Sequence, residues 1–266
     1  MRFVSLTTGS CGNCYYIESG DTAVLVDAGI GGRTINVRLR KLGITAMGMI
    51  KAVFVTHDHS DHIRGIGGVV EKFGVPVYST EKILKGMNRC YVLNPKVDVA
   101  SCRNIDKGET IELGEMRITA FEVPHDASDC VGYRIEADGK TLVIVTDIGE
   151  VTETAEKEMK GADFLVIEAN YDDEMLDNGP YPLTLRNRIR SGQGHLSNAK
   201  CAEYLKTHCG DRLKNICLCH ISQHNNDPQL AYMAACEALE EERKVVGEDV
   251  DLKVLPRGMS TGIMDV

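Results

Sequence analysis

The chain has 266 residues, of which 43% are hydrophobic, enough for the core of one large or two small domains. The formal net charge of −9 argues against broad electrostatic wrapping of nucleic acid but leaves room for a local basic groove. No run approaches the roughly 18 uninterrupted apolar residues of a membrane span. Residues 1–8 do not resemble a secretory leader, so a cytoplasmic location is expected.

Strand and helix patterns alternate along the whole chain. In the first half, short apolar runs between Gly-rich turns predict strands over residues 3–6, 14–18, 23–27, 52–56 and 75–78, with helices over 34–42, 63–73 and 80–87. In the second half, strands are expected over 115–123, 131–136, 140–146, 163–168, 215–219 and 252–255, and helices over 152–160, 197–207 and 228–245. No linker or repeat divides the chain, which predicts one compact α/β domain over residues 1–266, with two sheets between layers of helices.

The strongest chemical signal is the run Thr56-His57-Asp58-His59-Ser60-Asp61-His62, which directly follows the expected strand 52–56. Three of the chain's eight histidines lie within these few residues. A loop that leaves a strand end points alternate side chains the same way, so His57 and His59 can share one metal ion. Asp61 and His62 can then bind a second ion. The run therefore predicts a site for two adjacent divalent cations.

Three more potential ligands lie far along the chain. His125, Asp147 and His220 each stand just past an expected apolar strand. Because strand ends at one rim of a sandwich converge on a cleft, these residues are candidates to complete the two metal sites. The ten cysteines are dispersed and are expected to be reduced thiols. The C-x-x-C pair at residues 11 and 14 and the C-x-C pair at residues 217 and 219 are expected to be small buried side chains. The less favoured alternative is that these four cysteines form a zinc knuckle.

With these residues in this order, the chain resembles the metallo-β-lactamase superfamily over roughly residues 4–263. T-H-x-H-x-D-H is the defining pattern of that family, and the resemblance implies a four-layer αββα sandwich that holds two metal ions. It implies the following ligands: His57, His59 and His125 for metal 1, Asp61, His62 and His220 for metal 2, and Asp147 as the bridge. Asp27 matches an Asp of the family that contacts the metal ligands and is not itself a ligand.

The resemblance implies hydrolysis by a metal-activated water. Two cations lower the pKa of a water molecule between them and clamp the oxygens of a phosphodiester or acyl group. Asp61 would hold the nucleophile and accept its proton. The ligand types suit Zn, Mn and Fe alike, so the expected cofactor is two divalent metal ions, Zn or Mn, with Fe left open.

Two further segments narrow the substrate. His195 lies in Gly194-His195-Leu196-Ser197, which by residue type alone is an ordinary polar position before a helix. The segment is similar to an element of nuclease branches such as the tRNA 3′-processing endonuclease, whose histidine protonates the leaving oxygen, and this implies a catalytic role for His195. Residues 5–15 form a Gly-rich turn that is either a tight hairpin or an anion-binding loop. They are similar to the YycJ/WalJ-like subgroup, regarded as 5′→3′ DNA exonucleases, with Thr8 in place of the usual Ser.

We therefore predict a metal-dependent phosphodiesterase, a DNA exonuclease with 5′→3′ polarity by resemblance. The alternatives are a hydrolase of a small ester, thioester or cyclic phosphodiester, and a metal-binding sensor or scaffold without turnover. Only about 70 residues separate Asp147 from His220, too few for an inserted β-CASP nuclease domain. DNA is the expected partner, and no oligomeric state is predicted.

The sequence leaves two interpretations open for several polar residues. Arg186, Arg188 and Arg190 form either a phosphate-contact strip or a solvated face. Another group either lines the cleft or is structural: Glu168, Asn170, Tyr171 and His224.

Overall fold

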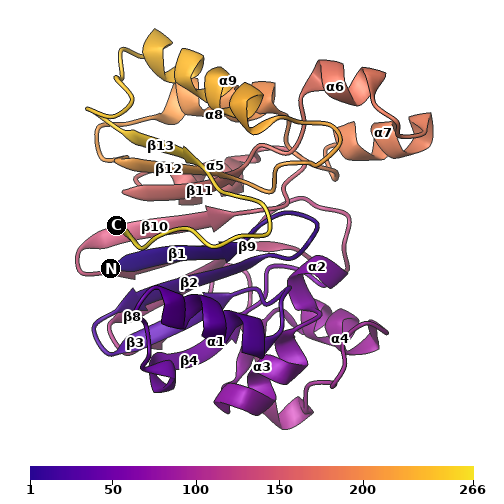
Figure 1. Ribbon diagram of the computed structural model, residues 1–266, viewed down its shortest axis with the longest axis vertical. Helices are drawn as coiled ribbons and strands as arrows, with labels where there is room; N and C mark the ends of the chain where they lie inside the picture. Colours follow the sequence, from indigo (N-terminus) through magenta and orange to yellow (C-terminus); the bar gives the residue numbers. More distant parts are fainter.

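The computed structural model describes residues 1–266 and contains two seven-stranded sheets that pack face to face (Figure 1). The first sheet has the strand order β14-β1-β2-β3-β4-β5-β6. Its strands are β1 (Arg2–Thr7), β2 (Cys14–Ser19), β3 (Thr22–Val26), β4 (Ile50–Phe54), β5 (Val77–Ser79), β6 (Cys102–Asn104) and β14 (Met264–Asp265). Every residue of β2 and β3 is buried, which explains why these strands are apolar on both faces.

The second sheet has the order β13-β12-β11-β10-β9-β8-β7. Its strands are β7 (Thr110–Leu113), β8 (Met116–Glu122), β9 (Val131–Ala137), β10 (Lys140–Val145), β11 (Phe164–Glu168), β12 (Asn215–Cys219) and β13 (Asp251–Val254). The turn between β9 and β10 is made by Asp138 and Gly139, both with positive φ, as the Asp-Gly pair predicts. The rings of Phe3 and Phe164, 5.0 Å apart, join the two sheets in the core.

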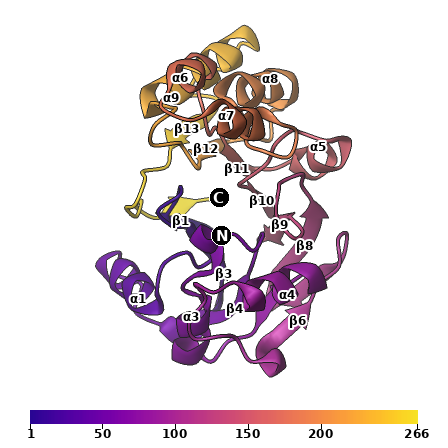
Figure 2. The ribbon, with the colours of Figure 1, turned by 90° about the vertical axis from the view of Figure 1, so that its right-hand side faces the viewer.

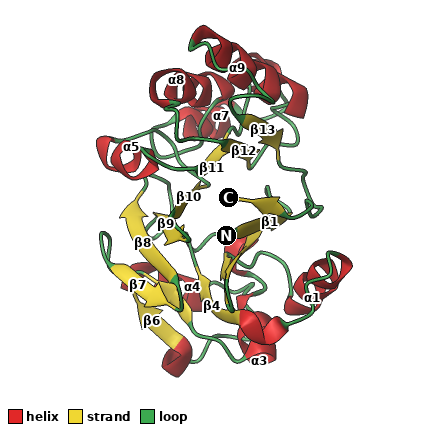
Figure 3. Ribbon diagram, turned by 90° about the vertical axis from the view of Figure 1, so that its left-hand side faces the viewer, coloured by secondary structure: helices red, strands yellow, loops and turns green.

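Helices cover both outer faces (Figure 3). On the first sheet lie α1 (Gly32–Lys41), α2 (Ser60–Ile63), α3 (Ile66–Phe73) and α4 (Glu81–Arg89). On the second lie α5 (Glu153–Met159), α6 (Asp173–Asn178), α7 (Leu183–Arg190), α8 (Asn198–His208) and α9 (Pro228–Glu241). Two short 3₁₀ helices span Met47–Met49 and Val99–Ser101. This arrangement confirms the predicted four-layer αββα sandwich. None of the helices combines the length and apolar composition that a membrane span requires.

The parallel strands point the same way and end at one edge of the molecule. β3 and β4 are parallel in the first sheet, and β10, β11 and β12 are parallel in the second. Figure 2 looks onto this edge, with α7 above it and α4 below. The loops that leave the strand ends here carry all the predicted metal ligands.

The structure differs from the predicted elements in a few places. The expected helix over 63–73 is two helices, α2 and α3, separated at Gly65, and α9 ends at Glu241 instead of residue 245. The chain breaks at Gly65 because it passes close to the loop after β3: a Cβ there would lie 2.1 Å from the carbonyl oxygen of Ile30. Elements that were not predicted are β6, β7, β14, α6 and α7, all of eight residues or fewer.

The break at Gly65 can be tested by adding a methyl group. We expect Gly65→Ala to lower the free energy of unfolding by about 1–3 kcal/mol, because a new Cβ must displace the backbone at Ile30. Gly68→Ala is the matched control, since no atom lies within 4 Å of its added Cβ in α3, and it is expected to stabilise by about 0.5–1 kcal/mol. Urea denaturation measures both, and a Gly65→Ala variant as stable as the wild type contradicts the close approach.

Candidate metal centre

The histidine-rich run leaves β4 as an extended segment and turns into α2 at Ser60. His59 has extended backbone angles (φ −66°, ψ 147°), whereas Asp61 and His62 lie in the first turn of the helix. This change of direction spreads the four potential ligands over two adjacent sites. Asp58 points away from them: its carboxylate accepts hydrogen bonds from the backbone N–H and the hydroxyl of Ser128, at 3.1 and 2.6 Å.

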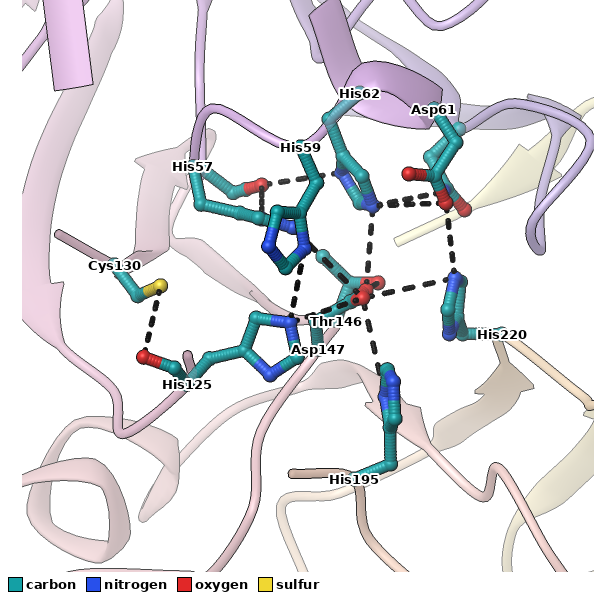
Figure 4. Close-up of polar contacts among 12 residues, drawn as sticks. His57, His59, Asp61, His62, His125, Cys130, Thr146, Asp147, His195 and His220 are labelled. Atoms are coloured by element: carbon teal, nitrogen blue, oxygen red, sulfur yellow. Dashed lines mark hydrogen bonds and ion pairs between the residues drawn. The ribbon is translucent and has the colours of Figure 1, made fainter. Parts of the chain in front are cut away.

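Asp147 lies at the centre of the cluster (Figure 4). Its carboxylate oxygens are 3.3 Å from His62 Nε2 and 3.7 Å from both His125 Nε2 and His220 Nε2. His57 Nε2 lies 3.9 Å away. The structure therefore brings His125, Asp147 and His220 to the run that follows β4, as the sequence predicts. Burial opposes ionisation of Asp147, but the charges of His220 and His62 outweigh it and hold the pKa of this carboxyl well below its usual range.

The potential ligand atoms fall into three compact groups whose members lie within 4.8 Å of one another. One group contains His57, His59, His125 and Asp147, a second contains Asp61, His62 and His220, and a third contains Asp147, Glu168, His195 and His220. His57 Nε2 and His220 Nε2 are buried and make no hydrogen bond. Because an unpaired buried nitrogen is costly, a cation beside these atoms would stabilise the arrangement. Imidazole and carboxylate are ligand types that suit divalent Zn, Mn or Fe, so the residues present fit such ions.

The imidazoles are oriented by hydrogen bonds from the nitrogen that points away from the other ligands, so the second nitrogen faces the cluster. His62 Nδ1 donates to Asp27 at 2.7 Å, and His125 Nδ1 donates to the carbonyl of Gly194 at 2.6 Å. His59 is held in the opposite sense: its Nε2 donates to the carbonyl of Asp126 at 3.2 Å, so Nδ1 faces the other ligands.

Asp27 anchors the first sheet to the ligand loop. It also accepts hydrogen bonds from the backbone N–H and the hydroxyl of Thr56, each at 2.8 Å. Its φ of 59° and the φ of 54° at His220 are unusual for residues other than glycine. Backbone strain of this kind is concentrated here at two residues of the candidate site.

Glu168, at the end of β11, holds two histidines at once. It is fully buried, and its Oε1 accepts hydrogen bonds from Nδ1 of His195 at 2.8 Å and Nδ1 of His220 at 3.0 Å. Its Oε2 accepts the backbone N–H groups of Ile148 and Leu196. Burial opposes ionisation, but the charge and hydrogen bond of His195 and the hydrogen bond of His220 lower the pKa of Glu168 to about 2. Sequence reasoning left this residue undecided, and the structure shows that it positions His195 beside the cluster.

The Gly-rich turn after β1 directs Asn13 at the candidate metal centre. Asn13 Oδ1 accepts from the backbone N–H of Gly9 at 2.8 Å, which leaves the amide nitrogen 2.8 Å from His62 Nε2 and 3.5 Å from Asp61. The backbone N–H groups of Gly9, Gly12 and Asn13 all have partners within the protein. These three N–H groups therefore stabilise a tight turn that holds Asn13 toward the candidate metal centre. The residue types of this turn alone do not indicate a role for Asn13.

The arginine strip predicted on the segment before His195 has partners of its own. Arg190 pairs with Asp177 at 2.7 Å, Arg186 donates to the carbonyl of Asp177, and Arg188 pairs with Asp126. Two of these arginines thus tie α7 to α6, and Arg188, which ties α7 to the loop after β8, also lines a cavity with His195 and His220.

The other undecided residues support the ligands or line the neighbouring cavity. Asn170 donates to the carbonyl of His220 at 2.8 Å, and buried Tyr171 packs with Leu176. Asn170 and His224 line the same cavity as His195 and His220, and His224 packs near Tyr181 and belongs to no ligand group. The cysteines of the C-x-x-C and C-x-C pairs are free and also belong to no ligand group.

Comparison with known proteins agrees with this geometry. Residues 22–221 match the family model described as "Beta-lactamase superfamily domain". The chain is 37% identical to "Exodeoxyribonuclease WalJ" of Streptococcus pneumoniae, over 95% of this chain and 93% of that protein. It is 32% identical to "Exodeoxyribonuclease YycJ" of Bacillus anthracis, over 100% and 99% of the two chains. Among solved structures, Zn²⁺-bound PqqB from Methylobacterium extorquens has the same fold, with a TM-score of 0.69, 20% identity and full coverage of both chains.

The hydrogen bonds that Asp27 accepts from His62 and Thr56 can be tested for their effect on metal binding. We expect Asp27→Asn to weaken divalent metal affinity by about 10- to 100-fold, because the amide cannot accept every hydrogen bond that the carboxylate accepts. Asp138→Asn is the control, because Asp138 also has a positive φ (55°) but lies in the β9–β10 turn. Competition of each protein with a chromogenic chelator measures the affinity, and equal values for the two variants would show that Asp27 does not support the ligands.

Proposed function

The chain belongs to the beta-lactamase superfamily, and on that premise we propose that it is a dinuclear metal-dependent phosphodiesterase that degrades DNA from the 5′ end. The observation that carries the proposal is the convergence of two ligand groups on Asp147, with the ring of His195 beside them. Relatives at 32–37% identity over nearly the whole chain are named exodeoxyribonucleases, which supports DNA as the substrate.

The proposed ligands follow the first two groups of atoms. His57, His59 and His125 would hold metal 1, and Asp61, His62 and His220 would hold metal 2. Asp147 would be shared between them, because its carboxylate approaches imidazoles of both groups. When bound, such ions lower the pKa of a water molecule between them and neutralise charge that develops on the phosphate. We take Zn²⁺ or Mn²⁺ as the ions because both accept this mixture of imidazole and carboxylate.

Asp61 is the proposed acceptor of the proton from the attacking water. Its Oδ2 lies 3.5 Å from His220 Nε2 and 3.8 Å from His62 Nε2. Burial opposes its ionisation, but the charge of His62 and the nearby imidazole of His220 outweigh it and lower the pKa of Asp61. The side chain therefore stays a carboxylate and can orient a water molecule beside the ligands.

His195 is the proposed proton donor to the leaving oxygen. Its Nδ1 is held by Glu168, so Nε2 is the nitrogen that faces a substrate. Burial disfavours the imidazolium, but the Glu168 carboxylate outweighs it and raises the pKa of His195. A histidine that keeps its proton near neutral pH is suited to protonate an alkoxide.

The space around His195 supports the 5′→3′ polarity. His195 and His220 line a cavity of about 310 Å³ between α7 and the loop at Ser222, whereas His59 lines a cavity of about 720 Å³ on the other side. When hydrolysis leaves a 5′-phosphate on the strand, the departing atom is the 3′ oxygen of the preceding nucleotide. That nucleotide would occupy the smaller cavity beside His195, so the piece released is the one at the 5′ end.

End-labelled DNA tests the activity and its direction. With Mn²⁺ or Zn²⁺, we expect a 5′-labelled strand to release labelled mononucleotide from the first turnover, while a 3′-labelled strand shortens gradually. Hydrolysis of bis(p-nitrophenyl) phosphate or a thioester without DNA cleavage would instead identify a hydrolase of small esters. Bound metal without any turnover would identify a sensor or scaffold.

The role of His195 predicts a dependence on the leaving group. We expect His195→Ala to lower kcat on DNA by about 10²- to 10⁴-fold, because the 3′ oxygen needs a proton as it departs. The loss on bis(p-nitrophenyl) phosphate should be much smaller, since p-nitrophenolate leaves without protonation. Metal content, measured by mass spectrometry, should stay at the wild-type value. Equal losses on both substrates, or loss of metal, would contradict the assignment.

A further inference from the structure

Helix α4 presents a basic face to solvent next to the candidate metal centre. Lys82, Lys85 and Arg89 are exposed, and the opposite face of the helix buries Ile83, Leu84 and Met87. The spacing of three and four residues places the cations in one row. At about 1.5 Å per residue, the row is roughly 10 Å long.

This basic face and the metal centre share one cavity. Lys82, Lys85 and Arg89 line the cavity of about 720 Å³ that His59 also lines. In Figure 2, α4 lies beside the edge where the parallel strands end. A polymer whose scissile phosphate sits at His59 therefore meets the α4 side chains as it leaves the site.

The cations on α4 are available for a ligand. Lys82 and Arg89 form no ion pair, and Lys85 pairs only with Glu81 at 2.6 Å, where both side chains are more than half exposed. An exposed pair of this kind contributes little and exchanges readily. The two acids that line the same cavity are already engaged, Asp58 by Ser128 and Asp126 by Arg188.

The position of α4 relative to the metal ligands is fixed by close packing. A Cβ on Gly86 would lie 1.9 Å from a carboxylate oxygen of Asp58, the residue between His57 and His59. Thr80, which caps the helix, also donates to Asp129 at 2.9 Å. The basic row is therefore held at a set distance from the ligands.

We propose that the basic face of α4, formed by Lys82, Lys85 and Arg89, binds the sugar–phosphate backbone of the DNA strand that remains after each cleavage. This inference rests on the proposed function. A row roughly 10 Å long exceeds the separation of neighbouring phosphates on one strand, so it can contact more than one phosphate. Contacts from Lys and Arg to phosphates carry no sequence information, which suits an enzyme that shortens any strand stepwise.

Charge reversal on α4 tests the proposal in the metal-loaded enzyme. The variant combines Lys82→Glu, Lys85→Glu and Arg89→Glu, and the control combines Arg40→Glu, Lys41→Glu and Lys51→Glu. The control makes the same change in net charge at exposed sites on the last turn of α1 and the start of β4, away from the strand ends that carry the ligands. Melting temperatures check that both variants are folded.

The expected result is a selective loss on the polymer. For the α4 variant, kcat/KM on DNA should fall at least about tenfold further than kcat/KM on bis(p-nitrophenyl) phosphate, and the slope of log(kcat/KM) against log[NaCl] should decrease in magnitude by about 2. The control variant should keep the wild-type ratio of the two kcat/KM values and the wild-type salt slope. If the wild type degrades DNA and the α4 variant matches the control, the basic face of α4 does not bind the strand, while the proposed function is unaffected. A wild type that degrades no DNA overturns both.

Discussion

The structure depends on one buried anion. Asp147 is 4% exposed and lies within 3.9 Å of nitrogens from His57, His62, His125 and His220. A carboxylate in this position is costly unless positive charge compensates it. The imidazoles alone compensate only when protonated, and ligands to a metal are not protonated, so the geometry makes most sense around cations. Four strand ends from two sheets have to meet at this carboxylate, which is why the αββα arrangement and the site are inseparable.

The second layer of contacts explains how the rings keep their places. His62 is fixed from the first sheet by Asp27, whereas His195 and His220 are fixed from the second sheet by Glu168. Because one carboxylate holds both His195 and His220, the proposed proton donor cannot move independently of the proposed metal ligand. The unusual φ angles at Asp27 and His220 are sustained by the buried strands β3 and β12 that precede them.

The sequence predicted the site residues that lie close together in the chain or directly follow a recognisable strand. The run from His57 to His62 is local, and His125, Asp147 and His220 follow apolar strands whose ends converge. Glu168 also follows a strand, but its partners lie 27 and 52 residues away, so nothing local distinguished a structural role from a catalytic one. The ion pairs of the α7 arginines could not be predicted, because their partners lie on α6 and after β8, and α6 itself was not predicted. The cations of α4 looked like any solvated helix face until the fold placed them beside His59.

The overall charge of −9 is a poor guide to the partner of this protein. At about 0.1 M salt, charges separated by more than roughly 10 Å are largely screened, so a phosphate at the site responds to nearby groups and not to the whole surface. Near His59 those groups are the three cations of α4 together with Asp58, which is hydrogen-bonded to Ser128, and Asp126, which is paired with Arg188. The acidic remainder of the surface disfavours binding of DNA elsewhere. With a basic row beside its metal centre and an acidic surface elsewhere, the protein therefore favours DNA strands that enter the site over strands that bind elsewhere on the surface.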